Sequence, residues 1–174
     1  MTAVFVEDGV DKGAIWHFGE PNKEQKALVA GTAWADLSHL NVIAVSGADR
    51  LKWLHDLTTQ HLSELGAGQW MPALILDAQG HVEYQFNLVD DGDTTWLVID
   101  PGYIDTLVAY LQKMKFMLRV DVRDASNEYA VLRAPGVETD LGGPFALAPR
   151  AELKEMQETF GATAMQVGTW ALDA

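Results

Sequence analysis

The chain has no cysteine in its 174 residues. Without a thiol, these residues cannot form a disulfide, supply a thiol nucleophile, or hold zinc or an iron–sulphur cluster through thiolates. Basic residues are also scarce, because 12 Lys and Arg stand against 25 Asp and Glu and leave a net charge of −13. This excess of negative charge repels phosphate backbones and anionic lipids. We therefore expect neither a nucleic acid nor a membrane as a direct partner.

Long apolar runs and the commonest catalytic motifs are missing as well. No stretch approaches the roughly 18 uncharged apolar residues of a membrane helix, and the first eight residues lack the basic start of a signal peptide, so we expect a cytoplasmic protein. Phosphate-binding glycine loops and the zinc-protease and serine-hydrolase motifs are absent. No two histidines have the i, i+4 spacing of a helical metal site; they are His17, His39, His55, His61 and His81.

Hydrophobic residues make up 48% of the chain, enough for a buried core in one domain, or in one domain and part of another. Alternation and helical spacing predict seven elements in the order strand, helix, three strands, helix, strand. Their expected ranges are 42–46, 49–65, 70–77, 81–88, 95–99, 101–114 and 118–122. Because Pro72 cannot donate to a central ladder, strand 70–77 should lie at an edge or contain a bulge.

Capping signals set the expected starts of the two helices. Ser46 and Asp49 have the spacing of a capping box. Asp100 followed by Pro101 is typical of an N-cap with proline at the first helical position. Both helices carry apolar residues three and four positions apart, so one face of each should pack on the sheet.

The order of elements predicts an α+β fold. We expect a ferredoxin-like β-α-β-β-β-α-β antiparallel sheet with two helices, plus the start of a second small α+β domain. The expected division is an N-terminal arm over 1–37 with a short helix at 23–34, the ferredoxin-like lobe over 38–125, and an incomplete second lobe over 126–174. In this last part we expect strands near 129–132 and 145–147 and a helix near 152–160. The final residues begin a further helix without a cap, which indicates a piece of a longer protein.

One face of the expected strand 81–88 is polar. His81, Glu83, Gln85 and Asn87 should project together from it, while the alternate residues are apolar. This face either meets solvent or forms the wall of a ligand site, where amides and a carboxylate could pair with the edge of a heterocycle. Trp53, Trp70 and Trp96 lie within regular elements and serve either the core or an aromatic wall.

A short basic run interrupts the acidic chain. It comprises Lys113, Lys115, Arg119 and Arg123. The simpler interpretation is that these cations favour the C-terminal end of helix 101–114. The alternative is a landing site for a small polyanionic ligand or tail.

Four short motifs in unbroken order carry a family resemblance. They are Asp-Leu-Ser-His-Leu at 36–40, Val-Ser-Gly-Ala-Asp-Arg-Leu at 45–51, Leu-Thr-Thr-Gln-His-Leu at 57–62 and Asp-Ala-Gln-Gly at 77–80. From about residue 24 to 133 the chain resembles the N-terminal half of the glycine-cleavage T-protein superfamily. Within it, the chain is most similar to the YgfZ-type folate-binding proteins, which are linked to iron–sulphur cluster maintenance and tRNA modification. The resemblance implies a three-lobed protein of roughly twice this length, with tetrahydrofolate in a central cavity that the first lobe borders.

The resemblance also assigns site residues, with one departure. The catalytic aspartate of the T-protein corresponds to Gln85, and an amide cannot act as the carboxylate that aminomethyl transfer uses. The resemblance therefore implies a folate binder without transferase chemistry, with no catalytic residue and no metal ligand assigned. The YgfZ hallmark, Lys-Gly-Cys-Tyr-x-Gly-Gln-Glu, lies downstream in the family and is absent here. The implied folate-binding residues are Leu40, Thr59, Gln60, Pro72, Gln85, Asn87, Val89 and Asp100.

Three functions remain open at this point. The first is a tetrahydrofolate-binding protein that supports iron–sulphur enzymes and tRNA-modifying enzymes. The second is a folate-dependent aminomethyltransferase, for which Glu83 is the acid closest to Gln85, about 7 Å along the same strand face at ~3.3 Å per residue. The third is a non-catalytic interaction domain whose polar strand face is only solvated.

Overall fold

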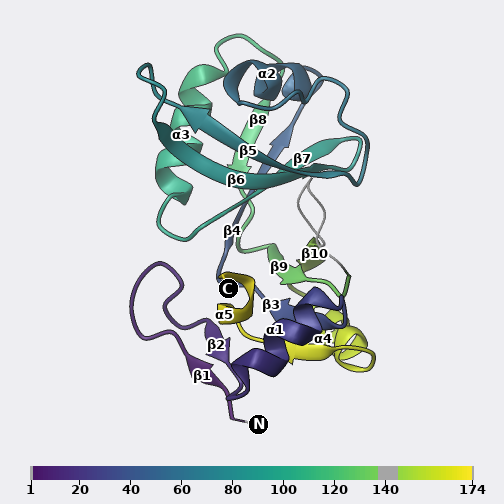
Figure 1. Cartoon of the computed structure of the whole chain (residues 1–174). Helices are drawn as coiled ribbons and strands as arrows, with labels where there is room; N and C mark the ends of the chain where they lie inside the picture. Colours follow the sequence, from purple (N-terminus) through teal and green to yellow (C-terminus); the bar gives the residue numbers. More distant parts are fainter. Residues whose placement is uncertain (1, 137–144, 174) are drawn as a thin grey trace. The chain divides into compact units, whose positions relative to one another are not determined.

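The computed structural model describes residues 2–136 and 145–173 and separates into two compact units. The first, which we call the inserted unit, is the continuous stretch 41–126. The second, the split unit, combines residues 1–40 with residues 127–174. Figure 1 shows the elements of both units along the chain. The predicted mixed α+β class is confirmed, because each unit contains both helices and sheet.

A five-stranded antiparallel sheet forms the inserted unit, in the order β5-β6-β7-β4-β8. Helices α2 and α3 cover one face of it, as Figure 1 shows. The core between helices and sheet holds Ile43, Trp53, Phe86, Leu107 and their apolar neighbours. The elements are β4 (Asn41–Ser46), α2 (Arg50–Leu57), β5 (Trp70–Leu76), β6 (Val82–Asp90), β7 (Thr94–Ile99), α3 (Ile104–Met114) and β8 (Asp121–Asp124).

The chain order of these seven elements is β-α-β-β-β-α-β. Strand β5 lies at the edge of the sheet, as Pro72 predicts. Each neighbour in the sheet is antiparallel, so β5 runs opposite to β4 although α2 joins them. A simple split β-α-β unit would join parallel strands through that helix. The ferredoxin-like description of the topology therefore stays a prediction.

Several predicted boundaries are wrong, each for a local reason. Helix α2 ends at Leu57 rather than near 65, because Thr58 is extended with φ −117° and ψ 168°. Helix α3 begins at Ile104, because Gly102 has a left-handed φ of 94° and residues 100–102 form a turn, so Asp100 is not its N-cap. Strand β8 begins at Asp121, after a turn at 115–118.

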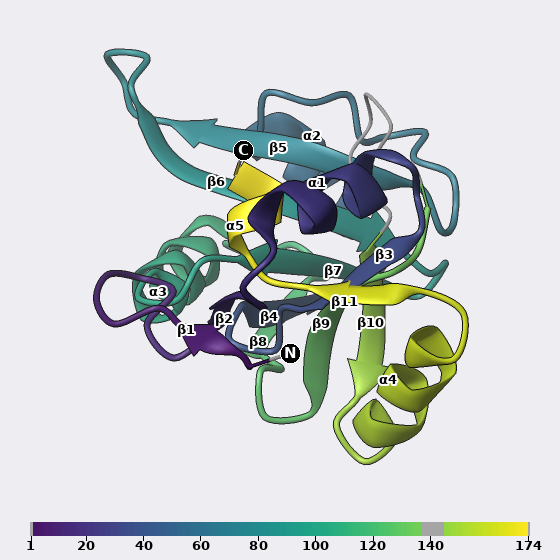
Figure 2. The same cartoon turned by 60° about the horizontal axis from the view of Figure 1, so that its bottom comes forward.

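The split unit is built around the four-stranded sheet β10-β9-β3-β11. Strand β3 precedes the inserted unit and β9 follows it, and they pair antiparallel with Ala35 opposite Arg133. Helix α1 contacts β3 and β11, as Figure 2 also shows. Helix α4 packs on Trp34 and Leu132 through Met156 and Phe160. The elements are β1 (Val4–Phe5), β2 (Ile15–His17), α1 (Pro21–Val29), β3 (Ala33–Asp36), β9 (Tyr129–Arg133), β10 (Phe145–Pro149), α4 (Leu153–Gly161), β11 (Met165–Val167) and α5 (Trp170–Asp173).

The predicted helix over 23–34 is wrong in its second half. Helix α1 ends at Val29, Gly31 adopts a left-handed φ of 70°, and the next residues form β3. Residues before and after the inserted unit thus share one sheet in this chain, while the predicted three-part division of the protein stays a prediction. Within residues 2–136 and 145–173, the longest helices are too short and too polar to cross a bilayer.

Candidate ligand cavity

A small cavity opens on the inserted unit where β6 passes the end of β7. Its volume is about 220 Å³. The start of β6, the end of β7 and the turn that leads into α3 supply all of its lining. The lining residues are Val82, Glu83, Tyr84, Gln85, Ile99, Asp100 and Tyr103. A volume below the roughly 300–1,000 Å³ of whole small-molecule sites accommodates one ring system rather than an extended ligand.

The alternation of β6 determines which side chains reach the two faces of the sheet. Tyr84, Phe86 and Leu88 belong to the core or pack against it, as the pattern predicts, whereas Val82, predicted for the same apolar face, is 55% exposed and lines the cavity. Gln85 and Asn87 lie between them in sequence and therefore on the opposite face. The predicted inclusion of His81 in this row is wrong, because β6 begins at Val82. The His81 amide instead donates to the Asp77 carboxylate at 2.8 Å within the preceding turn.

Hydrogen-bonding groups in the cavity are mostly acceptors. Glu83 and Asp100 are exposed carboxylates, and Gln85 adds an exposed amide that both donates and accepts. The Tyr103 ring, 46% exposed, offers a flat apolar surface beside them. Carboxylates and an amide next to an aromatic ring suit a planar guest that presents N–H donors, such as an aminopyrimidine edge.

Tyr84, which lines the cavity, forms a ring pair with Tyr110. The rings of Tyr84 on β6 and Tyr110 on α3 are 5.8 Å apart, with their planes inclined at 40°. Burial, together with the nearby Glu83 carboxylate and Tyr84, raises the pKa of Tyr110 above its ordinary value. The Tyr110 phenol therefore stays protonated at neutral pH and can donate a hydrogen bond.

Two of the eight predicted folate-binding residues, Gln85 and Asp100, line the cavity. Thr59 is one strand away, because Leu74 lies opposite Gln85 in the β5–β6 ladder. The Thr59 amide donates to the Leu74 carbonyl at 3.0 Å, and its hydroxyl accepts from the Leu74 amide at 3.3 Å. These contacts bring Thr59 to the outer edge of β5 beside Leu74.

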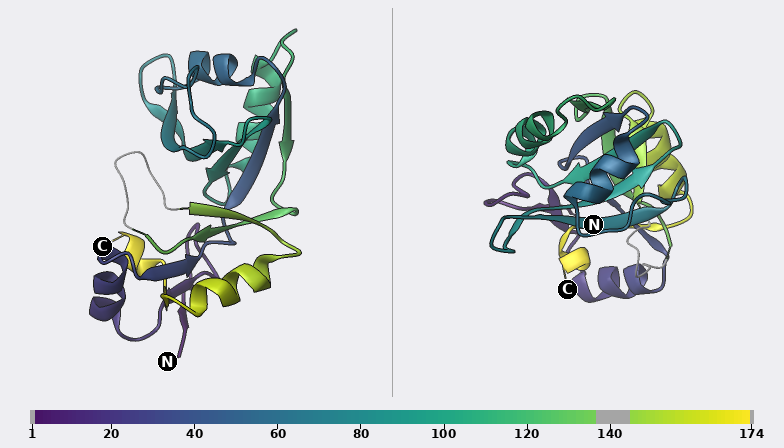
Figure 3. Two further views of the ribbon diagram at one scale, coloured as in Figure 1. Left: turned by 90° about the vertical axis from the view of Figure 1, so that its right-hand side faces the viewer. Right: turned by 90° about the horizontal axis from the view of Figure 1, so that it is seen from above.

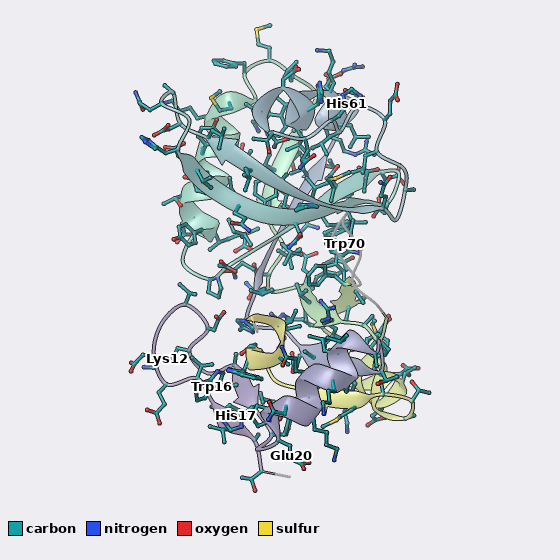
Figure 4. All side chains as sticks on the ribbon, viewed as in Figure 1. Lys12, Trp16, His17, Glu20, His61 and Trp70 are labelled. Carbon is teal, nitrogen blue, oxygen red and sulfur yellow. The ribbon has the colours of Figure 1, made fainter. Side chains whose placement is uncertain are left out.

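Three more predicted residues belong to the same sheet face, farther along the strands. Asn87 pairs with Pro72 on β5 and with Val98 on β7. Val89 pairs with Trp70 and Trp96, so an aromatic side chain flanks it on either side. Figure 4 labels Trp70 at its place on the first residue of β5. Residues paired across a ladder share a face, so this row continues the face that carries Gln85.

Gln60 and Leu40 stand apart from this row. The Gln60 carbonyl contacts His55 Nδ1 at 3.2 Å, in the segment that follows α2. The Leu40 amide donates to the Leu37 carbonyl at 2.9 Å, and Leu40 is the last residue of the first segment of the split unit. Their assignment to a folate site stays a prediction.

Sequence reasoning missed Ile99 and Tyr103 as lining residues. Both flank the Asp100-Pro101-Gly102 turn, which was interpreted as a helix start. Glycine two positions after an aspartate and one after a proline is typical of a turn. Predicting a turn here, rather than a helix start, would also have predicted that Tyr103 lies beside the end of β7.

Of the three tryptophans weighed from the sequence, only Trp53 lies in the core, where it is 4% exposed. Trp70 and Trp96 are half-buried on the opposite face of the sheet. The described residues contain no group of three or more His, Cys, Asp and Glu side chains that could hold a metal ion.

The sequence of the chain is similar to a known family and to two known proteins. Residues 3–140 match the family described as the GCVT N-terminal domain. The chain is 30% identical over 127 residues to an aminomethyltransferase of Koribacter versatilis, covering 67% of this chain and 32% of that protein. It is 26% identical over 132 residues to a mitochondrial iron–sulphur cluster assembly factor IBA57 homolog of Mycosarcoma maydis, covering 67% and 33%.

The fold also matches a solved structure. The crystal structure of the glycine cleavage system aminomethyltransferase T from Bartonella henselae superposes with a TM-score of 0.77 at 18% identity, covering 97% of this chain and 56% of that one. At this identity the likeness concerns the fold alone. The chain spans about a third of the length of the two sequence relatives.

Proposed function

The chain belongs to the GCVT N-terminal domain family, and on that premise we propose that it is part of a tetrahydrofolate-binding protein of the YgfZ type. Such a protein supports the assembly or repair of iron–sulphur clusters and the enzymes that modify tRNA. The likeness to an IBA57 homolog supports the iron–sulphur role. The family match and the likeness to an aminomethyltransferase support folate as the ligand.

The proposal excludes transferase chemistry because of one residue, Gln85. Gln85 lines the cavity, and the family resemblance implies that it takes the position of the catalytic aspartate of the T-protein. An amide is uncharged at every pH in use, so it can hold a pterin by hydrogen bonds but cannot serve as the carboxylate base or counter-ion of aminomethyl transfer. Gln85 would bind the ring edge, Tyr103 would stack on it, and Asp100 would accept from its amino group.

Isothermal titration of tetrahydrofolate tests the binding step. We expect Gln85→Ala to weaken binding by about tenfold, the effect of losing one or two hydrogen bonds to a ligand. Gln79→Ala is the matched control, because Gln79 is an exposed glutamine in the turn before β6 and does not line the cavity. Equal affinities of wild type and Gln85→Ala would remove Gln85 from the site, and the absence of heat when tetrahydrofolate is titrated into the whole protein would contradict the proposal.

A cell-based assay tests the iron–sulphur step separately. Cells that lack the protein should lose activity of iron–sulphur enzymes and the tRNA modifications that depend on them. The whole protein should restore both, and its Gln85→Ala variant should restore them less well. Full restoration by a variant that no longer binds tetrahydrofolate would show that support of iron–sulphur enzymes does not depend on folate binding.

Aminomethyl transfer is the second candidate, because the cavity contains two carboxylates, Glu83 and Asp100. Either could take the place of the missing aspartate. An enzyme of this type would release methylene-tetrahydrofolate from an aminomethylated donor, and Glu83→Gln or Asp100→Asn would abolish that release. The absence of product with active donor and tetrahydrofolate would rule it out.

A further inference from the structure

The two most exposed large apolar side chains of the inserted unit, Phe116 and Met117, are neighbours in one turn, and the exposed Leu118 follows them. Phe116 is 81% exposed, Met117 99% and Leu118 45%. We call residues 116–118 the apolar tip. It joins the end of α3 to β8 and shares no residue with the lining of the ligand cavity. Single exposed apolar residues are ordinary on a surface, but three adjacent ones form a patch that favours a partner.

The backbone of the apolar tip is strained at its largest side chain. Phe116 has φ 44°, and among the described residues it is the one non-glycine with a positive φ. A bulky residue in the left-handed region is strained, because its Cβ crowds the neighbouring carbonyl oxygen. Glycine or asparagine would relieve that strain, and exposure gives Phe116 no compensating burial within the inserted unit. Neither stability nor solubility of this unit accounts for a phenylalanine here.

The turn is anchored firmly at its base. The Asp49 carboxylate accepts from the Arg119 amide at 2.9 Å and from Arg119 Nε and Nη2 at 3.0 and 2.6 Å. On the other side, the Trp53 indole donates to the Met114 carbonyl at 3.1 Å. Val120, directly after Arg119, is buried. The tip is therefore presented in a fixed conformation, which lowers the entropic cost of binding.

The charges beside the apolar tip oppose those of the rest of the chain. The flanking cations are Lys113 and Lys115, while the charge of Arg119 is paired with Asp49. The two lysines stand out in a chain whose net charge is −13. A surface complementary to this patch carries carboxylates around an apolar centre.

We propose that the apolar tip is a docking site for a protein that offers an apolar pocket bordered by carboxylates. Phe116 and Met117 enter the pocket, and Lys113 and Lys115 pair with its acidic border. Buried aromatic and flexible sulphur-containing side chains are typical anchors of such interfaces. The proposal goes beyond folate binding and uses a different part of the inserted unit.

The geometry of the apolar tip favours a protein over a lipid surface. The backbone of Phe116 and the Asp49–Arg119 contact define a shape, which a protein pocket can match and a fluid bilayer does not need. A second copy of the chain is the other occupant that the test must distinguish.

Photo-crosslinking in cells of the source organism identifies the occupant. Met117→p-benzoylphenylalanine places the crosslinker at the tip, and Val29→p-benzoylphenylalanine is the control, since Val29 on α1 is an apolar residue 74% exposed. We expect a crosslinked protein at 117 but not at 29, with a contact peptide that contains carboxylates next to apolar residues. Lys113→Glu with Lys115→Glu should reduce the yield at least fivefold.

The purified partner then gives a quantitative answer. Phe116→Ser with Met117→Ser should weaken its Kd at least tenfold and leave tetrahydrofolate affinity unchanged, which separates this proposal from the folate proposal. Circular dichroism should show an intact fold, because both side chains are exposed. Crosslinks only to lipid or to a second copy, equal crosslinking at 29 and 117, or a yield that charge reversal leaves unchanged would overturn the proposal.

Discussion

The Asp90 carboxylate holds the Arg50 guanidinium at two points, with Oδ2 2.9 Å from Nε and Oδ1 2.9 Å from Nη2. Their side chains are only 3% and 11% exposed. Asp90 also accepts from the Thr95 hydroxyl at 2.5 Å and from the Gly92 amide at 2.8 Å. This network ties the first turn of α2 to the β6–β7 hairpin, so it fixes the sheet from which the cavity is built.

Removing the charge of Asp90 should therefore be costly. Asp90→Asn leaves Arg50 largely buried without its counter-ion, and we expect a loss of about 3 kcal/mol in the free energy of unfolding. Urea denaturation followed by circular dichroism measures it. Asp56→Asn is the control, because the Lys52–Asp56 pair is 80% and 59% exposed and should change stability by less than about 1 kcal/mol. Equal effects of the two variants would contradict this account.

Asp49 makes part of the stability depend on acid pH. Hydrogen bonds from the Arg119 side chain, and then from its backbone amide, lower the pKa of Asp49 from 3.8 to about 2. A carboxylate whose pKa is lower in the folded state contributes stability above the unfolded pKa and loses it as pH falls through the folded one. We expect this contribution to disappear between about pH 4 and pH 2. Denaturation at half-unit pH steps measures the free energy of unfolding against pH. In that window its slope should be smaller for Asp49→Asn than for wild type, and equal slopes would refute the assignment.

Gly47 makes a close backbone approach to the base of the apolar tip. Its φ is 108°, and a Cβ added there would lie 2.1 Å from the Arg119 carbonyl oxygen. We expect Gly47→Ala to cost at least about 2 kcal/mol through strain and clash together. Gly80 shares the left-handed φ but has nothing within 4 Å, so Gly80→Ala should cost about 1 kcal/mol from strain alone.

Gly66 completes the series. Its φ lies outside the left-handed range, and its nearest neighbour is Gln69 Oε1 at 3.6 Å, so Gly66→Ala should be close to neutral. Thermal unfolding of the three variants ranks them directly. A Gly47→Ala variant no less stable than Gly80→Ala would show that the contact with Arg119 relaxes at little cost.

Glu24 is a buried carboxylate in the split unit, fully shielded from solvent. Its Oε1 accepts from the Phe18 amide at 2.8 Å, and its Oε2 accepts from the Gly168 amide at 3.1 Å. Glu24→Gln puts an amide NH₂ against one of these donors, and we expect a loss of about 1–3 kcal/mol. Chemical denaturation measures it. Glu20→Gln, which changes only an exposed pair with Lys23, should be nearly silent, and a silent Glu24→Gln would exclude the role of Glu24 as a link between the two segments.

Residue patterns predicted the inserted unit best where burial repeats along one element. The alternation of β6 was visible in the sequence because Tyr84, Phe86 and Leu88 all meet one core. Helix ends were predicted less well, because they depend on single backbone angles. Thr58 and Gly102 stop or delay their helices through conformations that the helical spacing of apolar residues does not encode.

Longer-range contacts were beyond sequence reasoning. Asp49 has the spacing of a capping residue, yet its carboxylate makes no cap and binds Arg119 instead. The pairing of β3 with β9 joins residues on opposite sides of the inserted unit. Gln85 and Asp100 were predicted for the site through the family resemblance, whereas Tyr103 enters the cavity only because of a turn misinterpreted as a helix.

Figure 3 gives two further views of β3 and β9, which the inserted unit separates in sequence. On the ribosome, β3 emerges long before β9, while residues 41–126 already contain every partner that their own sheet needs. The nascent chain can therefore complete the inserted unit while residues 1–40 still lack the strands that follow it. Newly made β3 presents open edges during that interval, which makes it the segment for a chaperone to shield.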